Sequence, residues 1–463
     1  MKSTLTSAAA LMLLSLLVAI PVLAQASSAP AATTDATAAR VAAPVAPATP
    51  TTTPALAPAL LTLDPAALAE ARERLRQGDT ALQPALAALL RRAEVALTVA
   101  PRSVTHKTTL PPSGDKHDYM SMGPYWWPNP DTPTGLPYVQ RDGQRNPQVL
   151  GNAMDSQRLQ NMLGDARDLA LAHYFTGELR FAKKAADVIR TWFITPATRM
   201  NPSLRFGQGV PGVAEGRGIG IIDTRDLWWV MDAVALIAPS GAGLSSVEQR
   251  QLQTWWADYA HWLHTSPLGR DEANEKNNHG LFFDVQLAAL WLATGQTAQA
   301  RELVFDAQAR RFAAQFDPQG RMPLELARTR PYHYHTFTLQ AATRLASYAQ
   351  VLDGAAPADR TWPASDARCA RPATDPRCPL DLWRGVIEGK SLPAVLDFVA
   401  AAVVDPSAWT HATSIEPTPP LVTALPVLLA AQRELPGGRF SAALARLRVL
   451  APDHIAWVLW PLP

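Results

Sequence analysis

The chain has 463 residues, of which 48% are hydrophobic and 18% are charged, so it can bury a large core and is not disordered as a whole. Its formal net charge of +2 excludes a protein that binds nucleic acid or an anionic membrane through overall positive charge. A polyanionic ligand would need a local cluster of cations instead.

The first 26 residues have the pattern of a secretory signal peptide. Lys2 supplies a positive charge, residues 11–23 are apolar, and the small residues Ala24 and Ala26 offer two alternative cleavage positions. The apolar run is too short for a comfortable membrane span, and no later stretch is long and apolar enough to be one. We therefore expect a periplasmic or secreted protein without a membrane anchor after cleavage.

Residues 27–60 are almost entirely Ala, Pro, Thr and Ser, a composition typical of a disordered linker. The folded domain is expected to cover residues 61–463. Asp64 is a typical helix-capping residue, and Pro65 after it suits the first position of a helix. Helices are predicted over residues 66–77 and 80–97.

Residues 101–148 have no helical period and concentrate aromatic rings between prolines and glycines. Loops this long in a compact domain are usually functional. Two uses of the rings remain open, because flat aromatic faces suit both: they plug the end of a helical core, or they form a platform for sugar rings. The candidate sugar-binding residues here are Tyr119, Tyr125, Trp126 and Trp127.

From Asp155 onward, apolar residues recur at helical spacing and strand signals are scarce. Gly177, Gly295 and Gly354 stand where helices should end. Antiparallel helix pairs without an exact repeat predict an all-α fold, an incomplete α/α toroid with long loops lining a cleft. The predicted helices cover residues 158–175, 180–193, 224–237, 246–264, 280–292, 297–316, 336–352, 380–388, 394–404, 421–433 and 441–450.

A glycine-rich insert, residues 201–223, interrupts these helices and lets the backbone approach a ligand closely. Its glycines follow no predicted strand and open no helix, so they do not indicate nucleotide binding. Gln208 and Arg217 of this insert are candidate substrate-binding residues.

The residues with the richest chemistry fall in two stretches, which we predict to face each other across one cleft. Asn277, Asn278 and His279 lie between apolar helical segments, although an Asn here would also serve as a helix cap. The second stretch, residues 321–340, holds Arg328, Arg330, Tyr332, His333, Tyr334 and His335 within eight positions.

This set suits elimination from a polyuronate. Removing the C5 proton builds charge beside a carboxylate, which Asn277 or Asn278 with His279 and Arg328 would neutralise. Tyr334 would take that proton and return one to the departing O4 if a neighbouring guanidinium lowers its pKa from the ordinary value of about 10. The chemistry requires no metal and no cofactor.

Other residues of these stretches remain alternatives or supports. His333 and His335 flank Tyr334 and would replace His279 as the base or orient the tyrosine. His261 and His264 lie three positions apart on a predicted helix, but no further ligand nearby indicates a metal site. In an exported protein, Cys369 and Cys378 are a disulfide candidate.

The order of these motifs resembles the alginate lyase superfamily. Residues 277–280 before an aromatic-rich helix, then residues 324–328 leading to Tyr334, are similar to its active-site motifs, and residues 118–130 and 216–223 resemble the polysaccharide lyase family 38 branch. The resemblance spans about residues 104–352. It implies an incomplete α/α toroid with an Asn, a His, an Arg and a Tyr at the active site.

Carried over by position, the resemblance makes Asn278 and Arg328 carboxylate neutralisers, Tyr334 the proton-transferring residue and His279 a neutraliser or alternative base. The spacing from Arg328 to Tyr334 is one residue shorter than in better-known alginate lyases, so Arg330 is the alternative functional arginine.

The expected substrate is an acidic polysaccharide, with mannuronate-rich alginate first and glucuronan second, because the two sugars share the configuration at C4 and C5. We expect a monomer that does not bind nucleic acid. Two rivals remain: a non-catalytic polysaccharide-binding protein and an inverting glycoside hydrolase. Carboxylates available to that hydrolase are Asp118, Asp226, Asp284 and Glu325.

Overall fold

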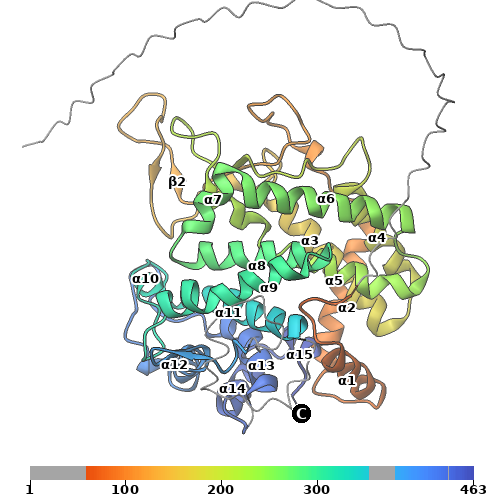
Figure 1. The fold of residues 1–463 in the computed structure, drawn as a ribbon, viewed down its shortest axis with the longest axis vertical. Coiled ribbons are helices and arrows are strands. Elements are labelled where there is room, and N and C mark those ends of the chain that lie inside the picture. Colours follow the sequence, from red (N-terminus) through yellow and green to blue (C-terminus); the bar gives the residue numbers. More distant parts are fainter. Residues whose placement is uncertain (1–58, 354–380, 436, 463) are drawn as a thin grey trace, which may run out of the picture. The chain divides into compact units, whose positions relative to one another are not determined.

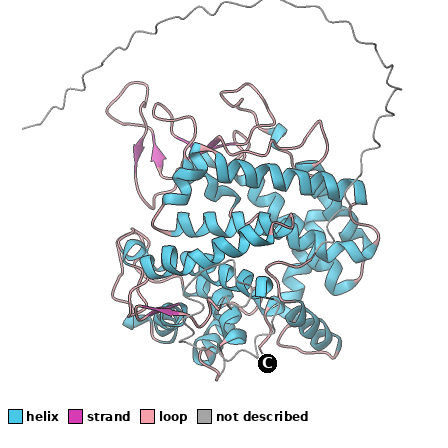
Figure 2. Cartoon of the chain, in the orientation of Figure 1, coloured by secondary structure: helices cyan, strands magenta, loops and turns pink. Residues whose placement is uncertain are grey.

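Helices make up most of the computed structural model, which describes residues 59–353, 381–435 and 437–462 (Figure 2). The predicted signal peptide and nearly all of the predicted linker lie outside the described residues, as do Gly354 and the two cysteines of the predicted disulfide. None of the helices in the described ranges combines the length and apolar character that a membrane span requires.

The N-terminal half begins as the sequence predicts, because the Asp64 side chain accepts a hydrogen bond from the Ala66 N–H at the start of the first helix. Gly177, in the left-handed conformation, ends the third. The helices are α1 (Pro65–Arg76), α2 (Gln83–Thr98), α3 (Ser156–Thr176), α4 (Leu179–Phe193), α5 (Trp228–Ile237) and α6 (Ser246–Thr265).

The second half continues with helix pairs of the same kind. Its helices are α7 (Pro267–Asn274), α8 (Asn278–Ala293), α9 (Thr297–Ala307), α10 (Pro323–Leu326), α11 (Pro331–Asp353), α12 (Leu392–Val404), α13 (Leu425–Glu434), α14 (Ser441–Leu450) and α15 (Ala456–Leu459). A π-helical segment, η5 (Gln308–Ala313), continues α9, and a 3-10 segment, η3 (Gly218–Thr224), precedes α5.

Strands in the described part of the chain form three short pairs. β1 (Met120–Met122) runs parallel to β4 (Phe206–Gly209), whereas β2 (Trp126–Trp127) with β3 (Val139–Gln140) and β5 (Val386–Ile387) with β6 (Lys390–Ser391) are antiparallel. The all-α prediction and the α/α toroid are confirmed.

One predicted helix is wrong. Residues 381–388 form a turn followed by β5, because Glu388 and Gly389 both adopt positive φ and close a two-residue hairpin between Ile387 and Lys390. In addition, α7 has no counterpart among the predicted helices. Pro267 opens it, and the Ser266 side chain caps it by accepting a hydrogen bond from the Gly269 N–H.

The central helix is α8, in which every residue except His279 and Leu292 is buried. It packs against α6, α7, α9 and α11, and Figure 1 shows α6, α8, α9 and α11 lying side by side. Since helices pack around α8 and nearly all of its residues are buried, the residues of its first turn have well-defined positions.

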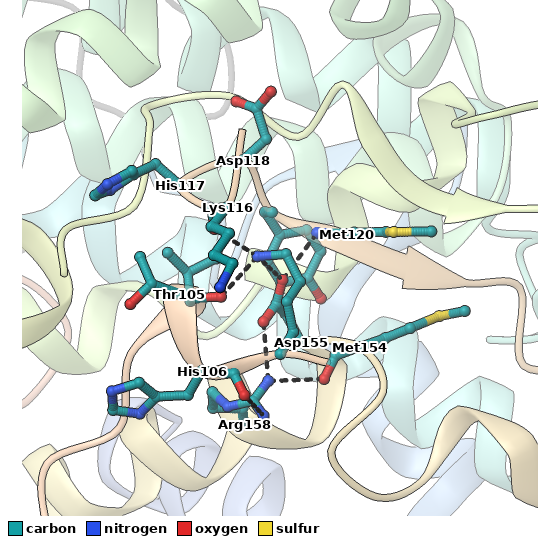
Figure 3. A network of polar contacts seen from close by, with 12 residues as sticks. Thr105, His106, Lys116, His117, Asp118, Met120, Met154, Asp155 and Arg158 are labelled. Carbon is teal, nitrogen blue, oxygen red and sulfur yellow. Dashed lines mark hydrogen bonds and ion pairs between the residues drawn. The ribbon is translucent and has the colours of Figure 1, made fainter. Parts of the chain in front are cut away.

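A buried ion network ties the long aromatic loop to the helices (Figure 3). The Asp155 carboxylate pairs with Lys107 at 2.9 Å and Arg158 at 3.0 Å, and it also accepts the Met120 N–H at 3.0 Å. All of these side chains are at most 7% exposed. Because Met120 begins β1, the network fixes the strand pair from which the cleft-lining loops extend.

Candidate active site

A cavity of about 670 Å³ lies between the aromatic loop, the glycine-rich insert and the N-termini of α8 and α11. The two stretches predicted to face each other do line this one cavity. The predicted site residues along its wall are Tyr125, Trp126, Gln208, Arg217, Asn277, Asn278, His279, Arg328, Arg330, His333 and Tyr334.

The turn from α7 into α8 presents the asparagines and His279. Asn277 is the N-cap of α8, and its side-chain oxygen accepts the His279 N–H at 3.0 Å. Asn278 is buried, and both its backbone N–H and its side-chain amide donate to Glu325 at 2.7–3.1 Å. The cap reading of Asn277 is therefore confirmed, and the Asn278 amide nitrogen is directed at a protein carboxylate.

A buried arginine on the π-helical segment holds this turn. Arg311 donates two hydrogen bonds to the Asp284 carboxylate, at 2.8 and 3.0 Å. It also donates to the backbone carbonyls of Ala273 and Glu275, both at 2.8 Å. Both charged side chains are at most 1% exposed. Arg310, the neighbouring residue, binds the same carboxylate from a more exposed position, so the π-helical turn directs two consecutive arginines to one acid.

His279 lines the cavity beside the two asparagines, with a side chain that is 17% exposed. Its Nδ1 lies 2.9 Å from Oε1 of Glu272, a fully buried residue of α7. The sequence offered no signal for Glu272, because it lies among polar residues that look like a solvent-exposed turn.

Tyr334 lies in the first turn of α11, and its hydroxyl joins two partners from different segments. It accepts a bond from Nη2 of Arg328 at 2.8 Å and donates to the Tyr125 hydroxyl at 2.8 Å. The Arg328 guanidinium also lies over the tyrosine ring, 3.8 Å from its centroid. The hydroxyl is therefore held in place before any substrate arrives.

The pKa of Tyr334 differs from the prediction. Burial raises the pKa of this phenol well above its ordinary value, the Tyr125 hydroxyl raises it further, and Arg328 offsets only part of the rise. The expectation that a neighbouring guanidinium lowers the pKa of Tyr334 is wrong, because the loss of hydration outweighs the effect of Arg328. Tyr334 thus rests as a proton donor.

The two candidate arginines have different surroundings. Arg328 is paired with Asp142, which follows β3 by two residues, with Nη2 at 2.7 Å and Nε at 3.3 Å from the carboxylate oxygens. Arg330 lines the cavity and pairs with no carboxylate among the described residues.

Two further arginines, Arg145 and Arg217, also line the cavity and form no ion pair with a described carboxylate. Arg217 donates to the Gln208 carbonyl at 2.8 Å, and burial lowers its pKa. With Arg330, they give the cavity an excess of positive charge despite the small net charge of the chain. Such an excess is suited to a polyanion.

Asp223 organises the glycine-rich insert. Its carboxylate accepts bonds from Tyr119 at 2.9 Å, Ser121 at 2.6 Å and the Gln208 amide at 2.8 Å. Gln208 has a φ of 46°, a conformation that costs a residue with a side chain about 1 kcal/mol or more and that accumulates at functional sites. The network holds the strained Gln208 against the cavity.

Three predicted substrate-binding residues do not line the cavity. Tyr119 and His335 are fully buried; the first binds Asp223, and Nε2 of the second lies 3.3 Å from the Gly320 carbonyl. Trp127 donates through its indole nitrogen to the Gln144 carbonyl and stacks under Arg141. These positions correct the prediction that the three side chains line the cavity, since each is buried or bonded to another part of the chain.

His333 does line the cavity, where it stacks on Phe337. Burial and the nearby Arg330, Arg225 and Arg328 lower the pKa of His333 to about 4, so its ring is neutral in the folded protein.

The carboxylates considered for a hydrolase are unsuited to that chemistry. Asp284 is buried and paired with Arg311, and Glu325 is buried and accepts hydrogen bonds from Asn278. Asp118 and Asp226 do not line the cavity. These four carboxylates, all in the described part of the chain, therefore do not form a pair of free catalytic acids in the cavity.

Comparison with known proteins agrees with this geometry. The profile of the family described as alginate lyase matches residues 103–358. A search of curated proteins returned no match.

Among solved structures, the chain is similar to an alginate lyase from Bacteroides ovatus, with 32% sequence identity, a TM-score of 0.76, and coverage of 88% of this chain and 100% of that one. It also shares its fold with alginate lyase A1-III from Sphingomonas species A1, at 14% identity and a TM-score of 0.53, over 87% of this chain and 98% of the other. A variant of the second enzyme has been solved in complex with a tetrasaccharide.

Proposed function

Because the chain belongs to the alginate lyase family, and is thus a polysaccharide lyase acting on alginate-like substrates, we propose that it cleaves β-1,4-linked polyuronate by β-elimination at the described cavity. One observation carries the proposal. The Tyr334 hydroxyl, bonded to Arg328, shares a cavity with His279 and with three arginines that lack carboxylate partners in the described chain.

In the proposed reaction, the sugar carboxylate binds the cationic wall, which stabilises the charge that builds as the C5–H bond breaks. The electron pair of that bond becomes the C4–C5 double bond, and the C4–O4 bond breaks. The Tyr334 phenol, protonated at rest, gives its proton to the departing O4. The product carries an unsaturated uronate at its new non-reducing end, and no step uses a metal or cofactor.

Two acceptors for the C5 proton fit the site. Tyr334 would act twice if its resting proton passes to solvent when the substrate binds: the phenolate then takes the C5 proton and gives that same proton to O4, which suits removal from the same face of the sugar. His279 would act instead if its Nε2 is unprotonated, since the Nδ1 side of the ring is occupied by Glu272. Asn277, whose amide nitrogen is not used in capping, is the better placed of the two asparagines to bind the carboxylate.

Mannuronate-rich alginate is the proposed first substrate and glucuronan the second, because both sugars present the same arrangement at C4 and C5. We propose that the protein works in the periplasm or outside the cell, on the basis of its signal-like N-terminus. A monomer is the proposed oligomeric state. Tyr125 and Trp126, on the cavity wall, are the proposed sugar-contacting rings.

The proposal is tested by incubating purified protein with alginate, polymannuronate, glucuronan and a neutral glucan while recording ultraviolet absorbance and reducing ends. A lyase produces both signals together on a polyuronate. Reducing ends without absorbance would indicate hydrolysis, and binding without either signal would indicate a non-catalytic protein.

A further inference from the structure

The buried pair formed by Glu272 and His279 has a geometry that restricts how the histidine can work. Glu272 is fully buried on α7, and its Oε1 lies 2.9 Å from Nδ1 of the imidazole. Its other oxygen, Oε2, is buried and has no hydrogen-bond partner among the described residues. The histidine is therefore the side-chain partner of this carboxylate.

An ionised carboxylate only accepts hydrogen bonds, so the bonded Nδ1 must carry the proton and Nε2 is left with a lone pair. We propose that Glu272 is a positioning residue, which fixes the His279 ring with Nδ1 protonated and presents Nε2 to the cavity as the acceptor of the C5 proton. This inference rests on the proposed function and selects one of its two candidate bases.

The surroundings make the pair rigid. Arg311 donates to the carbonyls of Ala273 and Glu275, which follow Glu272 along the chain, and Asn277 caps the helix on which His279 stands. Glu272 thus precedes the α7–α8 turn and His279 follows it, and the Arg311 and Asn277 hydrogen bonds hold this turn in place. A preorganised pair of this kind costs no reorganisation during the reaction.

Burial and nearby charges act on both members of the pair. Burial raises the pKa of Glu272, Glu275 and Asp271 raise it further, and the adjacent imidazole opposes the rise. Tyr259 and Arg217 are the other titratable groups that interact with the carboxylate. When Nε2 takes a proton, the ring becomes positive and the carboxylate beside it stabilises that charge.

The first test uses the wild-type protein and does not depend on activity. Nitrogen NMR of ¹⁵N-histidine-labelled protein at alkaline pH, with His279→Gln to assign the signal, reports which ring nitrogen carries the proton. We expect the Nδ1-protonated form. The Nε2-protonated form would overturn the proposal.

The second test compares pH profiles of kcat/KM on the polyuronate that gives the fastest reaction. Glu272→Gln removes the charge with little change in shape, so the acidic limb should move to lower pH by about one unit or more, and kcat should fall about 10- to 100-fold. Glu272→Asp, which keeps the charge, should restore the position of the limb. An unmoved limb in folded Glu272→Gln would contradict the proposal.

The control is Asp232→Asn. Asp232 is another fully buried carboxylate, which accepts the N–H groups of Leu61, Thr62 and Leu63 and does not line the cavity. This variant should lose thermal stability, while the acidic limb of its kcat/KM pH profile should stay at the wild-type position. If Glu272→Gln does not fold, the proposal is tested by the nitrogen NMR of the wild-type protein, which reports the tautomer of the His279 ring.

The two proposals fail in different ways. Absence of unsaturated product from every polyuronate, with Nδ1 protonated, would reject the lyase activity and leave only the fixed tautomer of the His279 ring. Normal lyase activity with an unmoved limb or the opposite tautomer would reject the positioning role alone.

Discussion

Replacement of Arg311 by methionine should destabilise the fold far more than the same replacement of Arg310. Both arginines bind Asp284, but the Arg311 side chain is 1% exposed and that of Arg310 is 38% exposed. Removing one partner of a buried ion pair costs about 3–5 kcal/mol. Two orphaned carbonyls, at Ala273 and Glu275, add to the loss, whereas the remaining Arg310 keeps Asp284 paired and reduces it.

We therefore expect Arg311→Met to lower the free energy of unfolding by about 3–5 kcal/mol and Arg310→Met to lower it by about 0–1 kcal/mol. Urea unfolding followed by circular dichroism and tryptophan fluorescence measures both. Equal losses, or a larger loss for Arg310→Met, would refute the claim that Arg311 is the clamp of the α7–α8 turn.

Three further predictions concern the same region. Gly280→Ala should lower Tm, because a Cβ there would lie 2.2 Å from the Glu275 carbonyl oxygen, whereas Gly164→Ala in α3, with nothing within 4 Å, should stabilise by up to about 1 kcal/mol. A higher Tm for Gly280→Ala would contradict this. Burial lowers the pKa of His335 to about 4, so its contribution to stability is complete above about pH 6.5 and lost as the pH falls towards 4. Calorimetry should show that the free energy of unfolding is lower at pH 5 than at pH 7, with a contribution from His335 on the order of 2 kcal/mol that is missing in His335→Phe. An unchanged pH dependence of stability in His335→Phe would contradict this prediction. Arg328→Lys should reduce kcat/KM by about 10²-fold, because lysine has no second nitrogen to replace the Nε bond to Asp142 and no planar group to lie over the Tyr334 ring. A greater loss of kcat/KM for Arg330→Lys would make Arg330 the functional arginine.

Periodicity and capping were enough to predict most of the helices and the meeting of the two active-site stretches. The apolar run after His279 predicted α8, and Asn277 marked its start, because an N-cap is a local interaction between neighbouring residues. The hairpin at residues 386–391 was missed because positive φ at Glu388, a non-glycine residue, has no reliable sequence signal.

Burial was the main property that the sequence did not show. Glu272 stands among polar residues and yet is fully buried, because α7 folds back against α8 and η3. The pKa of Tyr334 was predicted in the wrong direction for the same reason, since the loss of hydration depends on segments far away in the chain, such as the loop that carries Tyr125.

The most direct measurement is the rate at which Tyr334→Phe forms ultraviolet-absorbing product from alginate, with Tyr332→Phe as its control. Tyr332 is buried two residues earlier, and its hydroxyl has no hydrogen-bond partner in the described structure. We expect Tyr334→Phe to lose at least about 10²-fold in rate with an unchanged circular dichroism spectrum, and Tyr332→Phe to keep its activity. Near wild-type product formation by Tyr334→Phe would contradict proton transfer by this phenol.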